Sequence, residues 1–259
     1  MDALLLGWLV AALLQAALWG LAVRRRDAGL VDVGWAASLA LLAPLHAALA
    51  DGLPARRLLV GALGAVWGVR LTLHLVARLR PGTEDPRYAG LRARWGDRAD
   101  RWFLPFFQAQ ALLAGGLALA FALAARSPRD ALGAADLAGA ALWLVAVLGE
   151  ALADRQLARF RADPANAGRT CRAGLWGWSR HPNYFFEWLH WLAYVPLAWG
   201  GAGWYLAALP AAVVLLLVLT VTGIPPTEAQ ALRSRGEDYR RYQRTTSAFF
   251  PWPPRRGAA

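Results

Sequence analysis

The sequence of 259 residues has no lysine and a single cysteine, Cys171. One cysteine excludes a disulfide framework and any zinc or iron–sulfur site built from several thiolates. Charged residues are scarce, at 17% of the chain against about 25% in soluble domains. Serine-hydrolase, H-E-x-x-H and P-loop motifs are missing, and four scattered histidines predict no metal site. The 58% of hydrophobic residues excludes a disordered protein and favours a membrane protein.

Long apolar segments occupy most of the chain, and no segment alternates with the period of two that a membrane β-barrel requires. They predict an all-α, polytopic membrane helical bundle of about seven transmembrane helices. The expected spans are 3–23, 30–50, 58–76, 103–125, 132–153, 185–199 and 204–222. The arginines of the first span follow its apolar run, so we expect a retained span and not a cleaved signal peptide.

The basic residues of the chain are all arginine, and the formal net charge is +11. If the N-terminus is outside, 23 of the 28 arginines fall in cytoplasmic segments, namely 24–26, 78–101, 155–180 and 233–256. This asymmetry follows the positive-inside rule and predicts an outer N-terminus and a cytoplasmic C-terminus. The charge therefore indicates membrane orientation, and we expect no nucleic-acid partner.

Ionisable residues inside the expected spans gather near their cytoplasmic ends. The set comprises Asp32, Arg70, His74, Glu150, Asp154, Glu187 and His190, whereas His46 and Asp136 lie toward the outside. Some of these side chains could simply snorkel to the interface. A shared polar cavity open to the cytoplasm accounts for all seven, because charges within a membrane mark functional sites by default.

Aromatic residues accompany the arginines of the cytoplasmic segments, among them Trp176, Trp178 and Tyr184. Such a surface could stack a nucleotide base and clamp its phosphates, or it could anchor the protein to anionic lipids. The charge pattern alone slightly favours the lipid anchor over the nucleotide site. Residues 228–244 predict a single interfacial helix under the bundle, with 248–252 anchoring the end of the chain.

Four motifs together resemble a known family. They are Asp32-Val33-Gly34-Trp35, Glu84-Asp85-Pro86-Arg87-Tyr88, the run G-L-W-G-W-S-R-H-P-N-Y-F-F-E over 174–187, and G-E-D-Y-R-R-Y over 236–242. The chain resembles the bacterial, unknown-function branch of the steroid 5-alpha-reductase-like family over nearly its whole length. The resemblance implies one integral-membrane domain over 1–259, in the bacterial inner membrane. Residues 1–130 would form its substrate side and 131–259 its cofactor-binding part.

The resemblance further implies that NADPH binds in the cytoplasmic half. The positions matched to the cofactor side are Arg70, Glu150, Asp154, Arg161, Arg172, Asn183, Glu187 and Tyr239. Trp176, Tyr184 and Glu228 complete the expected cofactor set. Arg180 and His181 match the R-H-P-x-Y form of sterol reductases and membrane methyltransferases, and we expect them to orient the cofactor.

The chain lacks the Gln-Glu pair with which the steroid reductases polarise an enone carbonyl. Asp32 lies in the comparable region, and a carboxyl group in an apolar setting can donate a proton. Asp32 and Tyr88 are therefore the expected catalytic residues.

The expected function is NADPH-dependent reduction of an activated carbon–carbon double bond in a steroid-like or other lipid substrate. One alternative is a methyltransferase that uses S-adenosylmethionine, like the isoprenylcysteine carboxyl methyltransferases. Another is a non-enzymatic protein that binds membrane lipids.

Overall fold

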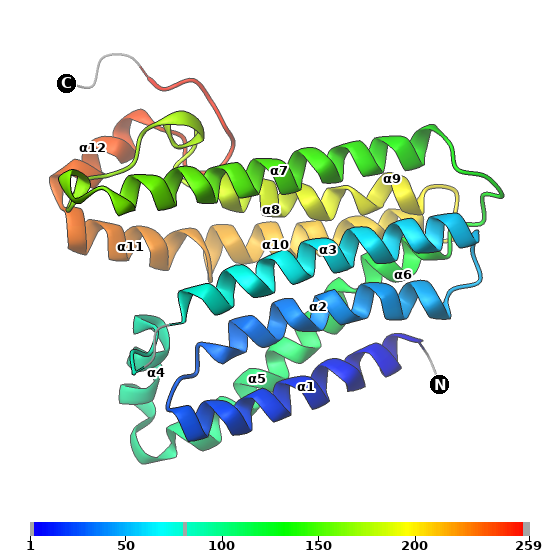
Figure 1. The fold of residues 1–259 in the computed structure, drawn as a ribbon, viewed down its shortest axis with the longest axis horizontal. Helices are drawn as coiled ribbons and strands as arrows, with labels where there is room; N and C mark the ends of the chain where they lie inside the picture. The colour runs from blue at the N-terminus through cyan, green and yellow to red at the C-terminus, as the bar shows by residue number, and fades with distance from the viewer. Residues whose placement is uncertain (1–2, 80–81, 256–259) are drawn as a thin grey trace. The chain divides into compact units, whose positions relative to one another are not determined.

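The computed structural model describes residues 3–79 and 82–255, and these residues form helices and loops without a strand (Figure 1). The α-helices are α1 (Ala3–Arg25), α2 (Leu30–Leu49), α3 (Pro54–Arg78), α4 (Pro86–Trp95), α5 (Ala99–Leu117), α6 (Leu119–Ala125), α7 (Ala134–Ala162), α8 (Pro182–Leu192), α9 (Tyr194–Ala198), α10 (Leu209–Thr220), α11 (Ile224–Arg235) and α12 (Glu237–Thr245). Short 3₁₀ helices occur at Gly96–Arg98, Pro164–Asn166, Gly174–Gly177 and Trp204–Ala208. Arg80 and Arg256, which belong to the arginine pattern, lie outside the described residues.

Six helical stretches within the described residues are long and apolar enough to cross a membrane. They are Ala3–Arg25, Leu30–Leu49, Pro54–Arg78, Pro86–Ala125, Ala134–Ala162 and Trp204–Arg235. Leucines such as Leu13, Leu58 and Leu148 project from them with exposed side chains, as expected of helices that face lipid. The predicted all-α membrane bundle is confirmed, and the chain is an integral membrane protein.

The expected span over 185–199 is not among the six stretches. The chain forms the shorter helices α8 and α9 there, and α8 ends at Leu192. Pro196 explains the break, because a proline has no N–H to bond the carbonyl four residues earlier. Ala193 instead bonds the His190 carbonyl, three residues back, at 3.2 Å.

The single interfacial helix expected over 228–244 is also wrong in detail. Gly236 separates α11 from α12, with a φ of 53° that favours glycine. Its N–H bonds the Leu232 carbonyl at 3.0 Å, which closes the end of α11. The chain can therefore change direction between the two helices.

The described helices fall into two compact units. The first unit comprises Met1–Leu137 and Tyr194–Pro210, and its core is apolar, with Leu39, Trp67 and Phe121 fully buried. α2 and α3 pack closely because small residues face each other. A Cβ added at Gly68 would lie 2.7 Å from Ala40 Cα, so a larger residue there would push the helices apart.

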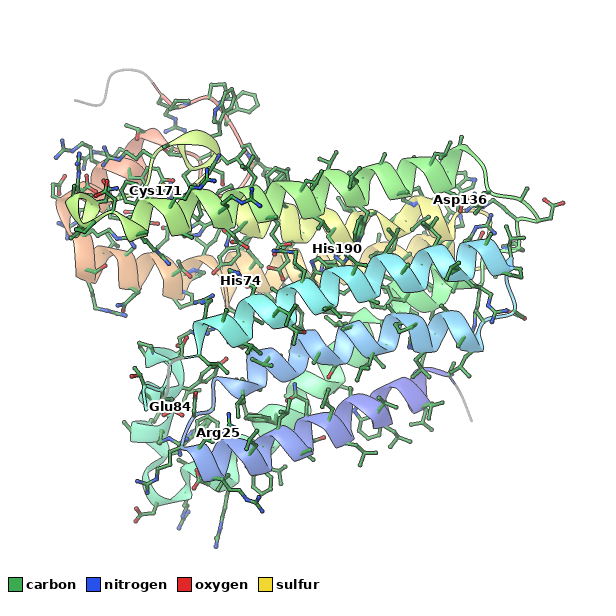
Figure 2. The ribbon with its side chains drawn as sticks, in the orientation of Figure 1. Arg25, His74, Glu84, Asp136, Cys171 and His190 are labelled. Carbon is green, nitrogen blue, oxygen red and sulfur yellow. The ribbon has the colours of Figure 1, made fainter. Side chains whose placement is uncertain are left out.

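One end of the first unit is held by a buried arginine. Arg56 donates through Nε to Asp136 Oδ1 at 2.7 Å, and through its two terminal nitrogens to the carbonyls of Ser127, Arg129 and Ala131. Arg129 donates to the same carboxylate at 2.8 Å, and Gly133 N–H at 2.9 Å. This Asp136 network joins the start of α3 to the loop before α7 (Figure 2).

The second unit comprises Ala138–Ala193 and Ala211–Ala259. Its long loop after α7 folds back onto that helix. Trp176 Nε1 donates to the Ala153 carbonyl at 2.9 Å, and Gln156 Oε1 accepts from Leu175 N–H at 3.0 Å. Farther along, Ser179 pairs with Ser247 in an isolated parallel bridge. These contacts fix the loop that carries Arg180 and His181.

Candidate functional site

A carboxylate lies at the centre of the polar residues of the second unit. Glu228, on α11, accepts hydrogen bonds from Arg180 Nε at 2.6 Å and Gln243 Nε2 at 2.7 Å. His181 Nε2 and the Tyr239 hydroxyl each lie 3.3 Å from its Oε1 atom. These five residues form the Glu228 cluster. It joins the R-H-P run to the consecutive helices α11 and α12, more than 40 residues later in the sequence.

Arg180 is held in one orientation by more than its ion pair. Its Nη1 donates to the carbonyls of Thr246 at 2.6 Å and Gln243 at 3.1 Å, at the end of α12. Its backbone N–H donates to Ser247 O at 2.8 Å. Arg180 therefore fastens the C-terminal segment to the loop before α8.

His181 is nearly fully buried at the N-cap of α8, and its ring stacks on Tyr184 with an interplanar angle of 3°. Burial lowers the pKa of His181, against the opposing effect of Glu228. A neutral imidazole that donates Nε2–H to Glu228 carries its proton on that nitrogen. The Nδ1 atom is then left as a hydrogen-bond acceptor.

Buried tyrosines support the cluster from α12. Tyr242 donates to the carbonyls of Trp176 and Ser179, and burial raises the pKa values of both Tyr239 and Tyr242. Both phenols are therefore protonated donors at neutral pH. Their hydroxyl groups position acceptors and do not carry charge.

Arg172 was expected on the cofactor side, and the structure pairs it with a carboxylate. Its Nη2 donates to Asp238 Oδ1 at 2.7 Å, and Thr170 N–H donates to the other oxygen at 2.8 Å. Burial opposes ionisation of Asp238, but the Thr170 and Arg172 contacts prevail and lower its pKa. Arg172 and Arg180 thus both organise the second unit through ion pairs.

The other expected cofactor residues of the second unit lie on two helices and one loop. Asn183, Tyr184 and Glu187 occupy the first turns of α8, all half-buried, and the Tyr184 hydroxyl lies 3.1 Å from Thr227 Oγ1. Glu150, buried, and Asp154, half-buried, are one turn apart on α7. Arg161 is exposed on the last turn of α7, and Trp176 is buried in the following loop.

The two expected catalytic residues are brought together in the first unit. The Tyr88 hydroxyl donates to Asp32 Oδ1 at 2.6 Å, and Arg87 Nη2 donates to Asp32 Oδ2 at 2.8 Å. These residues and Asp85 form the Asp32 cluster. Tyr88 is buried, whereas the Asp32 side chain is 29% exposed.

The E-D-P-R-Y motif explains how Tyr88 reaches Asp32. Asp85 caps α4 by accepting from Arg87 N–H at 2.9 Å, and Pro86 suits the first helical position. Glu84 accepts from Ala28 N–H at 2.8 Å and from Arg92 at 2.9 Å, which ties α4 to the start of α2 (Figure 2). Burial opposes the charge on Asp85, but Arg87 prevails and lowers its pKa.

Arg70 and His74 lie on α3 in the first unit, whereas Glu150, Asp154, Glu187 and His190 belong to the second. The cavity expected to be shared by these residues stays a prediction.

The sequence did not indicate two residues that the structure places in polar clusters, Gln243 of the Glu228 cluster and Arg56 of the Asp136 network. Asp136 was noticed as an intramembrane charge, and a search for its counter-ion would have pointed to the arginines of neighbouring loops.

The polar and aromatic side chains of the second unit supply some of the groups that a nucleotide cofactor needs. His181, Asn183 and Tyr184 are polar or aromatic groups around the start of α8, close in sequence to Arg180. Arg172 and Arg180 are ion-paired with Asp238 and Glu228, so toward a phosphate they would act mainly as hydrogen-bond donors. Arg161, on the last turn of α7, is the other expected cofactor arginine of this unit.

Comparison with known proteins gives a family and no activity. Residues 18–246 match a family model described as "Protein of unknown function (DUF1295)". An uncharacterized protein of Schizosaccharomyces pombe is 30% identical over 216 residues. That match covers 73% of this chain and 62% of the yeast protein. No solved structure matches.

Proposed function

The chain belongs to the DUF1295 family of membrane proteins, and we propose that it is an NADPH-dependent reductase of an activated carbon–carbon double bond in a lipid-like substrate. We place it in the bacterial cytoplasmic membrane with its arginine-rich loops in the cytoplasm. The membrane embedding of the bundle and the two polar clusters support this proposal. The steroid-like character of the substrate rests on the family resemblance alone.

The contact between Tyr88 and Asp32 carries the proposal. Reduction of a polarised double bond requires a proton as well as a hydride, whereas methyl transfer requires no acid. The Tyr88 phenol donates to the Asp32 carboxylate at 2.6 Å, and the Asp32 side chain is 29% exposed, which supports Tyr88 as the proton donor of such a reaction. NADPH, when bound, supplies the hydride that reaches the β-carbon.

The protein's own residues supply the rest of the step. Tyr88 would give its hydroxyl proton to the α-carbon of the substrate and be reprotonated by water that reaches the pair past the exposed side of Asp32. Arg87, whose Nη2 lies 2.8 Å from Asp32 Oδ2, holds the Asp32 carboxylate in place as the acceptor that orients the Tyr88 hydroxyl. In the second unit, Glu228 fixes Arg180 and His181 so that Nδ1 of His181 can accept a hydrogen bond from the cofactor.

A methyltransferase is the second candidate, and the Glu228 cluster favours it. In the isoprenylcysteine carboxyl methyltransferases an R-H-P-x-Y run accompanies a glutamate-bearing tail helix. Here Arg180 and His181 both contact Glu228, at 2.6 and 3.3 Å. A carboxylate among such donors could also orient S-adenosylmethionine.

Ligand-dependent stability separates these functions. The purified protein in zwitterionic nanodiscs is melted with NADPH and, separately, with S-adenosylmethionine. A ligand at one hundred times its Kd stabilises a binding protein by about 2.7 kcal/mol. We expect NADPH to raise the melting temperature and S-adenosylmethionine to leave it unchanged. The opposite response would establish the methyltransferase, and no response to either ligand would favour a lipid-binding protein.

The site assignment is tested with matched asparagine variants. Asn183→Ala should abolish the NADPH shift, because Asn183 belongs to the expected cofactor set at the start of α8. Asn166→Ala removes an asparagine whose side-chain amide donates to the Phe160 carbonyl at 3.0 Å, away from α8 in the sequence, and should keep the shift. Equal NADPH affinity in both variants would remove Asn183 from the site.

A further inference from the structure

A cavity of about 300 Å³ lies in the second unit, between the loop before α8 and the C-terminal segment after α12. Its polar lining combines Arg180, Arg244 and Arg255 with the hydroxyl residues Thr245, Thr246 and Ser247. None of the described residues that line it is acidic. Its volume is at the lower end of the range of about 300–1,000 Å³ typical of ligand pockets, which suits a small charged group.

The end of α12 at this cavity does not repel an anion. Carbonyl groups at a helix C-terminus carry partial negative charge. Here Arg180 Nη1 covers the carbonyls of Gln243 and Thr246, and the Arg255 N–H covers that of Thr245 at 2.9 Å. With these carbonyl groups occupied by donors, their partial negative charge is offset beside the cavity.

Two of the three arginines at the cavity have exposed side chains. Arg244 is exposed and donates to Glu237 at 2.9 Å, and Glu237 also lies 3.6 Å from Arg240. Arg255 is exposed, and its backbone bond to Thr245 holds its Cα beside the cavity. Arg180 stays fixed by Glu228 and forms the floor. The cavity thus combines one largely buried guanidinium group with two exposed ones.

Exposed aromatic side chains flank the cavity. Trp252, which lines it, is 70% exposed, and its N–H donates to the Trp178 carbonyl at 2.9 Å. Trp178 and Phe250 are also exposed. Tryptophan in such a position is typical of the level of lipid headgroups, where one edge of the ring is apolar and the other meets water.

We propose that this cavity binds a phosphate group, with Arg180, Arg244 and Arg255 as its guanidinium donors. Guanidinium forks match the geometry of phosphate oxygens, and threonine and serine hydroxyl groups supply further donors. The phosphate can come from the headgroup of an anionic phospholipid or from a soluble phosphate compound. Phosphate binding here does not depend on the proposed reductase chemistry.

Inorganic phosphate is the first probe. The full chain in phosphatidylcholine nanodiscs is titrated with phosphate at constant ionic strength, and binding is followed by the melting temperature. The double variant Arg244→Gln/Arg255→Gln should bind phosphate about tenfold or more weakly, as expected when two charge-assisted contacts are removed. Arg233→Gln has a single charge change on α11 outside the cavity, and should bind like the wild type.

The variants keep the test independent of folding. Arg255→Gln alone retains the backbone bond to Thr245, and should weaken binding severalfold without lowering the melting temperature of the unliganded protein. Equal phosphate affinity in the wild type and the double variant would overturn the proposal. So would equal weakening by Arg233→Gln, because the effect would then belong to the net charge of the surface.

A second arm identifies the source of the phosphate. The titration is repeated in nanodiscs that contain phosphatidylglycerol. If headgroups occupy the cavity, the wild type loses its affinity for soluble phosphate while the double variant changes only through the charge of the bilayer. If a soluble compound is the ligand, both proteins respond equally to the change of lipid.

Discussion

Two aspartates of the first unit, near opposite ends of α2, show how differently a membrane protein can use a carboxylate. Asp136 is 2% exposed and accepts hydrogen bonds from Arg56, Arg129 and Gly133 N–H. Asp32 is 29% exposed and accepts from Tyr88 and Arg87. Both carboxylates are paired, so pairing alone does not tell a structural carboxylate from a reactive one.

The two carboxylates differ in whether their hydrogen-bonding groups are still accessible to other molecules. Arg56 is fully buried, and its remaining donors are bound to the carbonyls of Ser127, Arg129 and Ala131. The hydrogen-bond donors of Arg56 in the Asp136 network are therefore all engaged. The network serves to join the loops. The Asp32 side chain is 29% exposed, so water can reach it, and in the proposed reaction the Tyr88 pair exchanges a proton there.

The largest expected effect is on the stability of the Asp136 network. Asp136→Asn removes the counter-ion of a buried guanidinium and should destabilise the protein by about 3–5 kcal/mol. Thermal melting of the nanodisc-embedded protein measures the loss. Asp130→Asn changes an exposed aspartate in the same loop and should alter stability by less than about 0.5 kcal/mol. Equal melting temperatures for the two variants would show that the network does not hold the loops.

The Glu228 cluster should give an intermediate effect. Glu228 is 14% exposed and accepts from Arg180, His181, Tyr239 and Gln243, so Glu228→Gln removes its charge and turns an amide group toward donors. We expect a loss of about 1.5–3 kcal/mol, the range for hydrogen bonds to charged groups. Glu237→Gln, at an exposed position of α12, should melt like the wild type. An unchanged melting temperature for Glu228→Gln would mean that the cluster is solvated and does not organise the second unit.

The sequence predicts the bundle well because membrane spans depend on local apolar runs, which a window of about 20 residues contains completely. It fails where one residue interrupts a run. Pro196 divides the expected sixth span into α8 and α9, and Gly236 divides the expected tail helix. Both interruptions are visible in the sequence, but their effect depends on whether the surrounding packing bends or continues the helix.

For the sites as well, the sequence indicates single residues in local motifs but not the contacts between distant residues. Asp32 and Tyr88 could be chosen one by one, since each is a proton donor in a short motif. Their contact depends on how Glu84 and Asp85 fold the segment before α4, and on the closeness of that segment to α2. Arg56 and Asp136 are 80 residues apart, and no local pattern relates them. Their pairing follows only from the packed structure.

The smallest expected change in stability belongs to Tyr88, and it separates the open carboxylate most clearly from the enclosed one. Tyr88→Phe removes one hydrogen bond to a partly exposed group and should cost about 1 kcal/mol. Turnover of an enone lipid with NADPH should nevertheless fall by about 10²-fold or more, the usual contribution of a positioned acid. Tyr205→Phe, at an exposed tyrosine of the same unit, should change neither quantity. A Tyr88→Phe protein that is strongly destabilised but fully active would place Asp32 with Asp136 among the carboxylates that hold the fold, because its hydroxyl bond would then serve packing and not proton transfer.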